Sequence, residues 1–192
     1  MRQFKNYAPQ RIQAFEPLPV GGYVAVIKGV AIESYNGSEL MNVMVDIAEG
    51  DQKDYYMKDY KSQSSDNKKW RGNVKLWLPK DDGSEKDDYT KRTFNNFMAC
   101  VEESNPGYHW GWDENTLKEK KIGILAREFE WLNKNTGKTT WLIELVNPHS
   151  VDDIRNGKFK MPERRPLKNQ PVSAPAPGSF QPAGDEDDDL PF

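Results

Sequence analysis

Residues 90–104 read TKRTFNNFMACVEES and carry the one clear helical pattern of the chain. Its apolar side chains recur at the i, i+3, i+4 and i+7 spacing of one helix face, namely Phe94, Phe97, Met98 and Val101. Thr90 is suited to cap the start of this helix, and Asn-Pro-Gly at residues 105–107 ends it. The position of this helix among the predicted strands therefore indicates which fold class the chain adopts.

Strand patterns lie on both sides of the predicted helix. The runs before it cover residues 23–33, 40–48 (resumed at 53–60) and 70–78. The runs after it cover residues 121–132 and 138–146, with a turn at 133–137 between them. Asn36-Gly37 predicts a tight hairpin turn between the first two runs. In the first run, we expect one face to hold Val24, Val26, Val30 and Ile32.

This order of strands and helix favours a mainly β fold. Three strands, one helix and two further strands match the OB-fold, a five-stranded Greek-key barrel with one helix between strands 3 and 4. Other small barrels share the strand count, so the order alone leaves them open. A fold of this class also hosts many functions, and the function must be argued from the residues.

The chain of 192 residues is long enough for one domain with tails. Residues 1–20 hold several prolines and predict an extended basic and aromatic arm. Residues 21–150 form the predicted domain. Residues 151–184 predict a linker, basic at first and then Pro-rich and disordered, and residues 185–192 form an acidic tip.

Composition excludes several classes of protein. One cysteine, Cys100, and two histidines leave no disulfide framework and no zinc-ligand spacing. No nucleotide-binding loop or nucleophile elbow is present, so we predict no enzyme, no metal and no cofactor. With no apolar stretch of signal-peptide or membrane-span length, we expect a protein of the bacterial cytoplasm or nucleoid.

The C-terminus reads DEDDDLPF over residues 185–192. An acidic run stays solvated, whereas a terminal Phe on a tether can enter an apolar pocket while its carboxylate meets a cation. We therefore predict a docking peptide for partner proteins, formed by Asp187, Asp188, Asp189, Leu190, Pro191 and Phe192. The alternative is an acidic solubilising tail. Without this tip, the chain holds 27 basic and 25 acidic residues, a weakly basic balance.

This tip resembles that of bacterial single-stranded DNA-binding proteins, which end in acidic residues, an apolar residue, Pro and Phe after a disordered linker. The resemblance covers the last eight residues and implies recruitment of replication, recombination or repair proteins. The N-terminal arm, a charged insertion around residues 80–88 and a longer core depart from the usual bacterial members. The body looks more like the divergent versions of bacteriophages and mobile elements.

Cations and aromatic residues alternate on three stretches, which suits binding of phosphates and stacking of unpaired bases. The candidate residues are Lys53, Tyr55, Tyr56, Trp70, Arg71, Lys75, Trp77, Arg127, Trp131, Lys134 and Lys138. Strand alternation predicts that Arg71, Lys75 and Trp77 share one face. The tyrosines could instead be strand packing partners, and Trp77 could pack under the helix. We expect Trp131 to be exposed, Trp141 to be in the core, and residues 109–112 to pack locally.

The segment 155–168 adds further cations, namely Arg155, Lys158, Lys160, Arg164, Arg165 and Lys168. It could extend the phosphate track, receive the acidic tip, or be a solvated linker root. Together these patterns predict a protein that coats single-stranded DNA without strong sequence preference and recruits partners through its tip. The alternative is an OB-fold adaptor that mimics or competes with a host tip without binding DNA. The chain could be monomeric or a homo-oligomer, because OB strands can close alone or pair between subunits.

Overall fold

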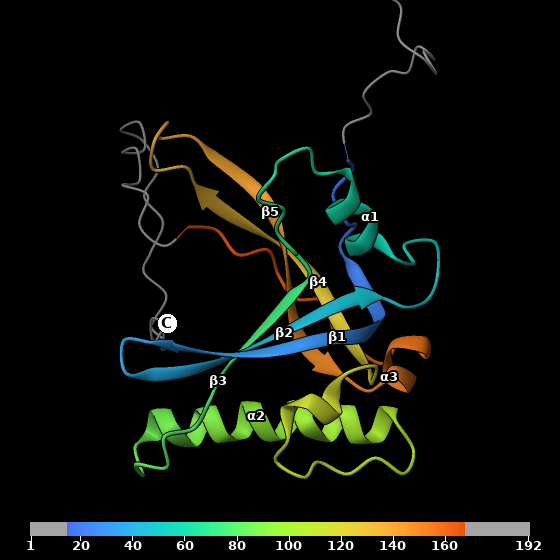
Figure 1. Cartoon of the computed structure of the whole chain (residues 1–192), viewed down its shortest axis with the longest axis vertical. Coiled ribbons are helices and arrows are strands. Elements are labelled where there is room, and N and C mark those ends of the chain that lie inside the picture. The colour runs from blue at the N-terminus through green and yellow to red at the C-terminus, as the bar shows by residue number, and fades with distance from the viewer. Residues whose placement is uncertain (1–14, 168–192) are drawn as a thin grey trace, which may run out of the picture.

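The structure, a computed structural model, describes residues 15–167. These residues contain a five-stranded antiparallel sheet in the order β3-β2-β1-β4-β5 (Figure 1). The strands are β1 (Gly21–Tyr35), β2 (Ser38–Ile47), β3 (Asn73–Trp77), β4 (Lys121–Leu132) and β5 (Thr139–His149). The outer strands β3 and β5 also pack against one another. The prediction of a mainly β protein is confirmed.

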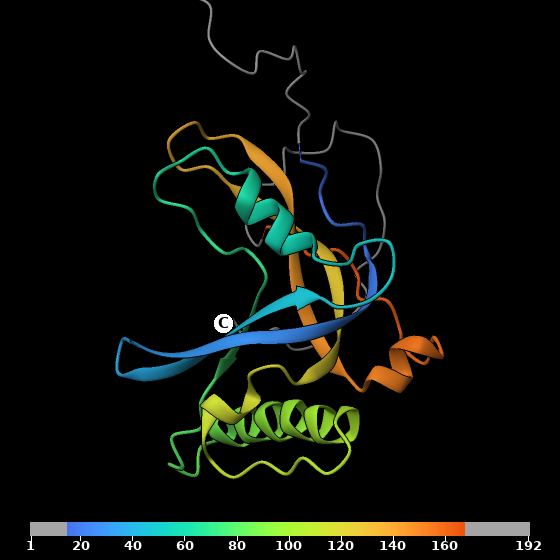
Figure 2. The same cartoon turned by 45° about the vertical axis from the view of Figure 1, so that its right-hand side comes forward.

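The helices lie around this sheet. They are α1 (Tyr55–Ser62), α2 (Glu85–Ser104), the 3₁₀ helix η1 (Glu114–Leu117) and α3 (Val151–Arg155). Figures 1 and 2 show α2 across one end of the sheet and α1 at the opposite end. The predicted position of a helix between the third and fourth strands is confirmed by α2. Among the residues described, no helix is long and apolar enough to cross a bilayer.

The β1–β2 hairpin forms where the sequence predicts it. Asn36 and Gly37 have φ angles of 49° and 73°, the left-handed region that a two-residue hairpin turn requires. Tyr35 pairs with Ser38 directly across the turn. The β4–β5 hairpin likewise begins at the predicted residue 121, and the turn after Leu132 leads into β5 at Thr139.

The face predicted for the first strand is wrong because a β-bulge interrupts it. The bulge lies between Ile27 and Gly29 and inserts one extra residue. Before the bulge, Ala25 and Ile27 face the core, and after it Val30 does. The alternation therefore shifts by one residue. Val24 and Val26 lie on the other face.

Helix α2 begins five residues before the predicted cap at Thr90. The Ser84 hydroxyl accepts a hydrogen bond from the backbone N–H of Asp87 at 3.2 Å, and this capping starts the helix at Glu85. The predicted end at Ser104 is confirmed. The predicted apolar stripe is buried against the sheet, with Phe97 fully enclosed. Burial also raises the pKa of the Cys100 thiol to about 11, which keeps it protonated.

The extended run predicted over residues 53–60 is wrong, because these residues form α1. Asp54, at the N-cap position, makes no side-chain capping bond. The buried carboxylate of Asp46 on β2 takes over this role. Its Oδ1 accepts the backbone N–H of Tyr56 at 2.9 Å, and its Oδ2 accepts that of Met57 at 3.3 Å. A capping partner ten residues away in sequence therefore favours a helix where local composition favours a strand.

Substitution Asp46→Ala should lower the free energy of unfolding by about 2–3 kcal/mol, because it leaves buried backbone N–H groups without acceptors. Burial raises the pKa of Asp46, against the backbone hydrogen bonds that lower it, so the charge itself is disfavoured there. Asp46→Asn, which keeps an acceptor oxygen, should therefore cost less. Urea unfolding followed by far-UV circular dichroism measures both, with the exposed Asp51→Ala as control. Equal losses for Ala and Asn would contradict this role.

The folded part of the chain continues past residue 150, where the sequence predicts a linker. Helix α3 starts at Val151, with the Ser150 hydroxyl accepting the N–H of Asp153. The chain then returns to β4, where Arg165 donates its N–H to Glu128 and accepts one from Glu130. This parallel pairing is available because β1 pairs with β4 only as far as Ala126. The linker prediction for residues 168–184, the tip at 185–192 and the arm over residues 1–14 lie outside the described residues.

Glu49 ties α3 to the sheet. Its carboxylate accepts hydrogen bonds from Arg155 Nη2 at 2.6 Å and from Lys121 Nζ at 2.9 Å. The pKa of Glu49 is thereby lowered to about 2, first by Arg155 and then by Lys121. The charged form is thus favoured by folding.

Glu49→Gln should reduce stability at neutral pH by at most about 1 kcal/mol, since the ion pairs are partly exposed. A carboxyl group with a depressed pKa stabilises the fold fully above its ordinary pKa of 4.5 and loses this contribution as the pH falls to about 2. The difference in unfolding free energy between the two proteins should therefore shrink across this range. Urea titrations at stepped pH measure it, and a difference that does not change with pH would contradict the assignment.

Candidate nucleic-acid interface

Two stretches of the sequence hold cations and tryptophans without any acidic residue. Residues 67–80 contain five lysines and arginines and two tryptophans. Residues 131–143 contain two lysines and two tryptophans. The described residues as a whole are slightly acidic, so these stretches are where a polyanion meets least repulsion. The first stretch includes β3, and the second forms the end of the β4–β5 hairpin.

The outward face of β3 presents two of the predicted residues. Val74 and Leu76 point into the core, whereas Lys75 and Trp77 alternate with them and are exposed. This part of the predicted face is confirmed. Trp77 is 40% exposed and lies opposite the buried Leu40 of β2. Trp77 therefore does not pack under the helix, and part of its side chain is exposed.

Trp70 and Arg71 do not join that face, because β3 begins only at Asn73. Trp70 is half-buried, and its indole N–H donates to the carbonyl oxygens of Val45 and Gly72, both at 3.1 Å. The guanidinium of Arg71 pairs with Asp59 at 3.0 Å. Both side chains thus hold the segment before β3 against the body.

The tyrosines predicted as a stacking platform are packing residues of α1. Tyr56 is 5% exposed, and burial raises the pKa of its hydroxyl. Tyr55 is half-buried, donates its hydroxyl to the carbonyl oxygen of Glu16, and packs against the ring of Phe15. Neither ring is placed to stack on a base. Lys53 is exposed in the turn before α1.

The β4–β5 hairpin carries exposed apolar residues on both faces. Trp131 is 45% exposed, as predicted, and Leu142 lies on the same face of the ladder. Trp141, predicted to be in the core, is 39% exposed on the opposite face. That prediction is wrong because the end of the hairpin extends beyond the body (Figure 1), so the core of the domain does not enclose Trp141. Lys134 and Lys138 are exposed in the turn between the strands.

Some of the cations near the hairpin are neutralised and others are not. Arg127 pairs with Glu144 at 2.7 Å, and Arg165 pairs with the same carboxylate at 2.9 Å. Within residues 15–167, Lys75, Lys134 and Lys138 have no acidic partner, and neither does Lys53 before α1. These lysines are therefore the predicted cations best placed to meet phosphates.

Arg164 is a candidate that the sequence did not distinguish from the other cations of segment 155–168. Its guanidinium lies over the Trp141 ring, 5.1 Å from the ring centre. The pairing of Arg165 with β4 brings it there. An arginine over an exposed indole offers a phosphate contact beside a stacking surface.

The residues 109–112 form a packing cluster on α2, as predicted. Trp110 packs against the core, and Trp112 stacks on Phe94 with ring centres 6.1 Å apart. Trp112 is nevertheless 80% exposed. It lies outside both acid-free stretches.

The two stretches come together at the outer strands. In Figures 1 and 2, the segment that leads from α1 into β3 passes beside the β4–β5 hairpin. The contact between β3 and β5 agrees with this placement. The two acid-free stretches therefore lie side by side. In residues 15–167, no His, Cys, Asp and Glu side chains gather as a metal site.

Compared with known proteins, the chain matches no protein-family model and no curated protein sequence.

Proposed function

We propose that this protein binds single-stranded DNA through an OB-fold body and recruits other proteins through its C-terminal tip. Binding is stoichiometric, and no covalent step is involved. The observation that carries the proposal is the set of exposed tryptophans on β3 and on the β4–β5 hairpin, which lie in acid-free stretches with unpaired lysines.

The arrangement of the strands supports an OB-fold. β1 pairs with both β2 and β4, a helix lies between β3 and β4, and the outer strands contact each other. These are the features expected of a partly open five-stranded barrel. Barrels of this class bind oligonucleotides on the face of strands 2 and 3 and on the loops that join strands 1–2 and 4–5. Lys75, Trp77 and the β4–β5 hairpin occupy two of these places.

The exposed side chains suit unpaired bases better than duplex DNA. An indole ring stacks on any base, which gives about 1–3 kcal/mol per base without sequence preference. Trp131 and Trp141 lie on opposite faces of the hairpin, so the hairpin can insert between segments of a flexible strand. Duplex DNA keeps its bases stacked and leaves these rings without partners. The lysines contact phosphates and release counterions, so affinity should fall with salt.

Trp77→Ala and Trp131→Ala should each weaken binding to oligo-dT by roughly tenfold, because each removes a stacking surface worth about 1–3 kcal/mol. Fluorescence anisotropy of labelled oligo-dT and of the matching duplex, at two salt concentrations, measures the loss and the preference for single strands. Trp112→Ala is the matched control, since Trp112 is more exposed than either residue but lies in the loop after α2, where it stacks on Phe94.

Equal affinity of all three variants and the parent protein would contradict the proposed interface. If the folded parent protein binds no oligo-dT at low salt, the proposed function fails. The adaptor that acts through the tip alone is then the better explanation.

Deletion of residues 185–192 should leave the affinity for single-stranded DNA equal or higher, because it removes five acidic charges. The same deletion should abolish capture of bacterial replication or repair proteins that recognise acidic Leu-Pro-Phe termini. Anisotropy measures the first effect, and pull-down with a purified protein of that kind measures the second. Replacement of Phe192 by Ala alone is the conservative version. If the deletion variant captures the partner protein as well as the parent does, the proposed docking role of the tip is contradicted.

A further inference from the structure

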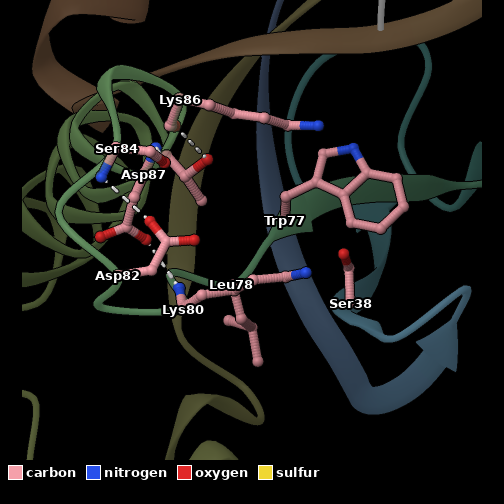
Figure 3. Close-up of a pocket in the computed structure, with 9 residues that line it drawn as sticks. Ser38, Trp77, Leu78, Lys80, Asp82, Ser84, Lys86 and Asp87 are labelled. Carbon is pink, nitrogen blue, oxygen red and sulfur yellow. Dashed lines mark hydrogen bonds between the residues drawn. The ribbon is translucent and has the colours of Figure 1, made fainter.

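A cavity of about 310 Å³ lies at the C-terminal end of β3, between that strand and the start of α2 (Figure 3). Its lining includes Ser38, Trp77, Lys80, Asp82 and Lys86. Trp77 belongs to the proposed DNA-binding face, whereas the other residues were not among the predicted binding residues. The cavity therefore continues the outward face of β3 beyond the end of the strand.

Two lysines converge on this cavity from different elements. Lys80 follows β3 along the chain, and Lys86 lies in the first turn of α2. Figure 3 shows both side chains extending across the cavity, toward Trp77 and Ser38. An indole wall beside two ammonium groups provides the two contacts that a nucleotide needs, one for its base and one for its phosphate.

The acidic residues at the cavity are largely engaged elsewhere. The carboxylate of Asp87 accepts the backbone N–H groups of Lys80 and Asp81 and pairs with Lys91 at 3.0 Å. Burial alone would raise the pKa of Asp87, but hydrogen bonds from Lys91 and the backbone lower it. The charge of Asp87 is therefore compensated by Lys91. Asp82, the other acidic side chain that lines the cavity, accepts the N–H of Ser84.

The dimensions of the cavity limit its occupant. Pockets for small ligands begin at about 300 Å³. A single nucleotide unit suits this volume, whereas several nucleotides do not. Five of the lining residues, Lys80, Asp82, Ser84, Lys86 and Asp87, come from the 80–88 stretch, which the sequence marks as a charged insertion relative to the usual bacterial single-stranded DNA-binding proteins.

We propose that this cavity is a nucleotide subsite at one end of the DNA-binding track. One base stacks on Trp77, and its phosphate lies between Lys80 and Lys86. The inference rests on the proposed function and assigns to the insertion a direct role in holding the strand. The negative charge of Asp82 repels the phosphate, so removal of this charge should strengthen the binding of DNA.

The double substitution Lys80→Ala/Lys86→Ala in the full-length protein tests the subsite. We expect roughly tenfold weaker binding of oligo-dT at low salt, and a salt slope smaller by about 0.7 for the one phosphate lost. Asp82→Asn keeps the acceptor for Ser84 and should strengthen binding by about twofold, the size of a surface charge effect. The control Arg92→Ala/Lys118→Ala removes the same charge from exposed residues outside the track.

The outcomes separate this inference from the proposed function. If both double variants bind equally, while Trp131→Ala still weakens binding, the subsite is refuted and the proposed function stands. An Asp82→Asn protein with unchanged affinity would also place the phosphate elsewhere and refute the subsite. If the parent protein binds no single-stranded DNA, the proposed function and the subsite fail together.

Discussion

The structure depends on how β1 is shared between its two neighbours. Its first residues pair with β4 as far as Val26, and from Ala25 onward it pairs with β2, so the two ladders overlap at only these positions. The bulge between Ile27 and Gly29 follows at once and increases the local twist. The two hairpins consequently leave the sheet in different directions, β1–β2 near α2 and β4–β5 beyond the opposite end (Figure 1). The exposure of Trp131 and Trp141 follows from this bend.

Features set by neighbouring residues could be predicted from the sequence. The Asn36-Gly37 turn, the apolar stripe of residues 90–104 and the β4–β5 hairpin each depend on spacings within one short segment. Helix α1 could not be predicted, because its cap comes from Asp46 on another element. The bulge in β1 could not be predicted either, because both faces of this strand hold apolar residues of the same types. Trp141 shows a further limit, because strand alternation does not reveal whether a hairpin extends beyond the body.

The candidate interface shows the same division between local and distant causes. The sequence brings cations and aromatic rings together on β3 and the hairpin, and Lys75, Trp77 and Trp131 are exposed there. It does not show which cations are already paired. Arg71 and Arg127 are held by Asp59 and Glu144, residues 12 and 17 positions away. The absence of acidic residues over 67–80 and 131–143 is a sequence signal that would have marked the lysines most available to phosphates.

The return of the chain to β4 has a consequence for how the protein can be shortened. From Arg127 onward, one edge of β4 is not paired with β1, and Arg165 covers it through parallel hydrogen bonds. An uncovered strand edge is a template for pairing with another copy of the same chain. A fragment ending at residue 150, the boundary that sequence patterns favour, would present such an edge beside an apolar hairpin. Residues 151–167 thus protect this edge of the sheet from self-association, and a shortened chain should retain them.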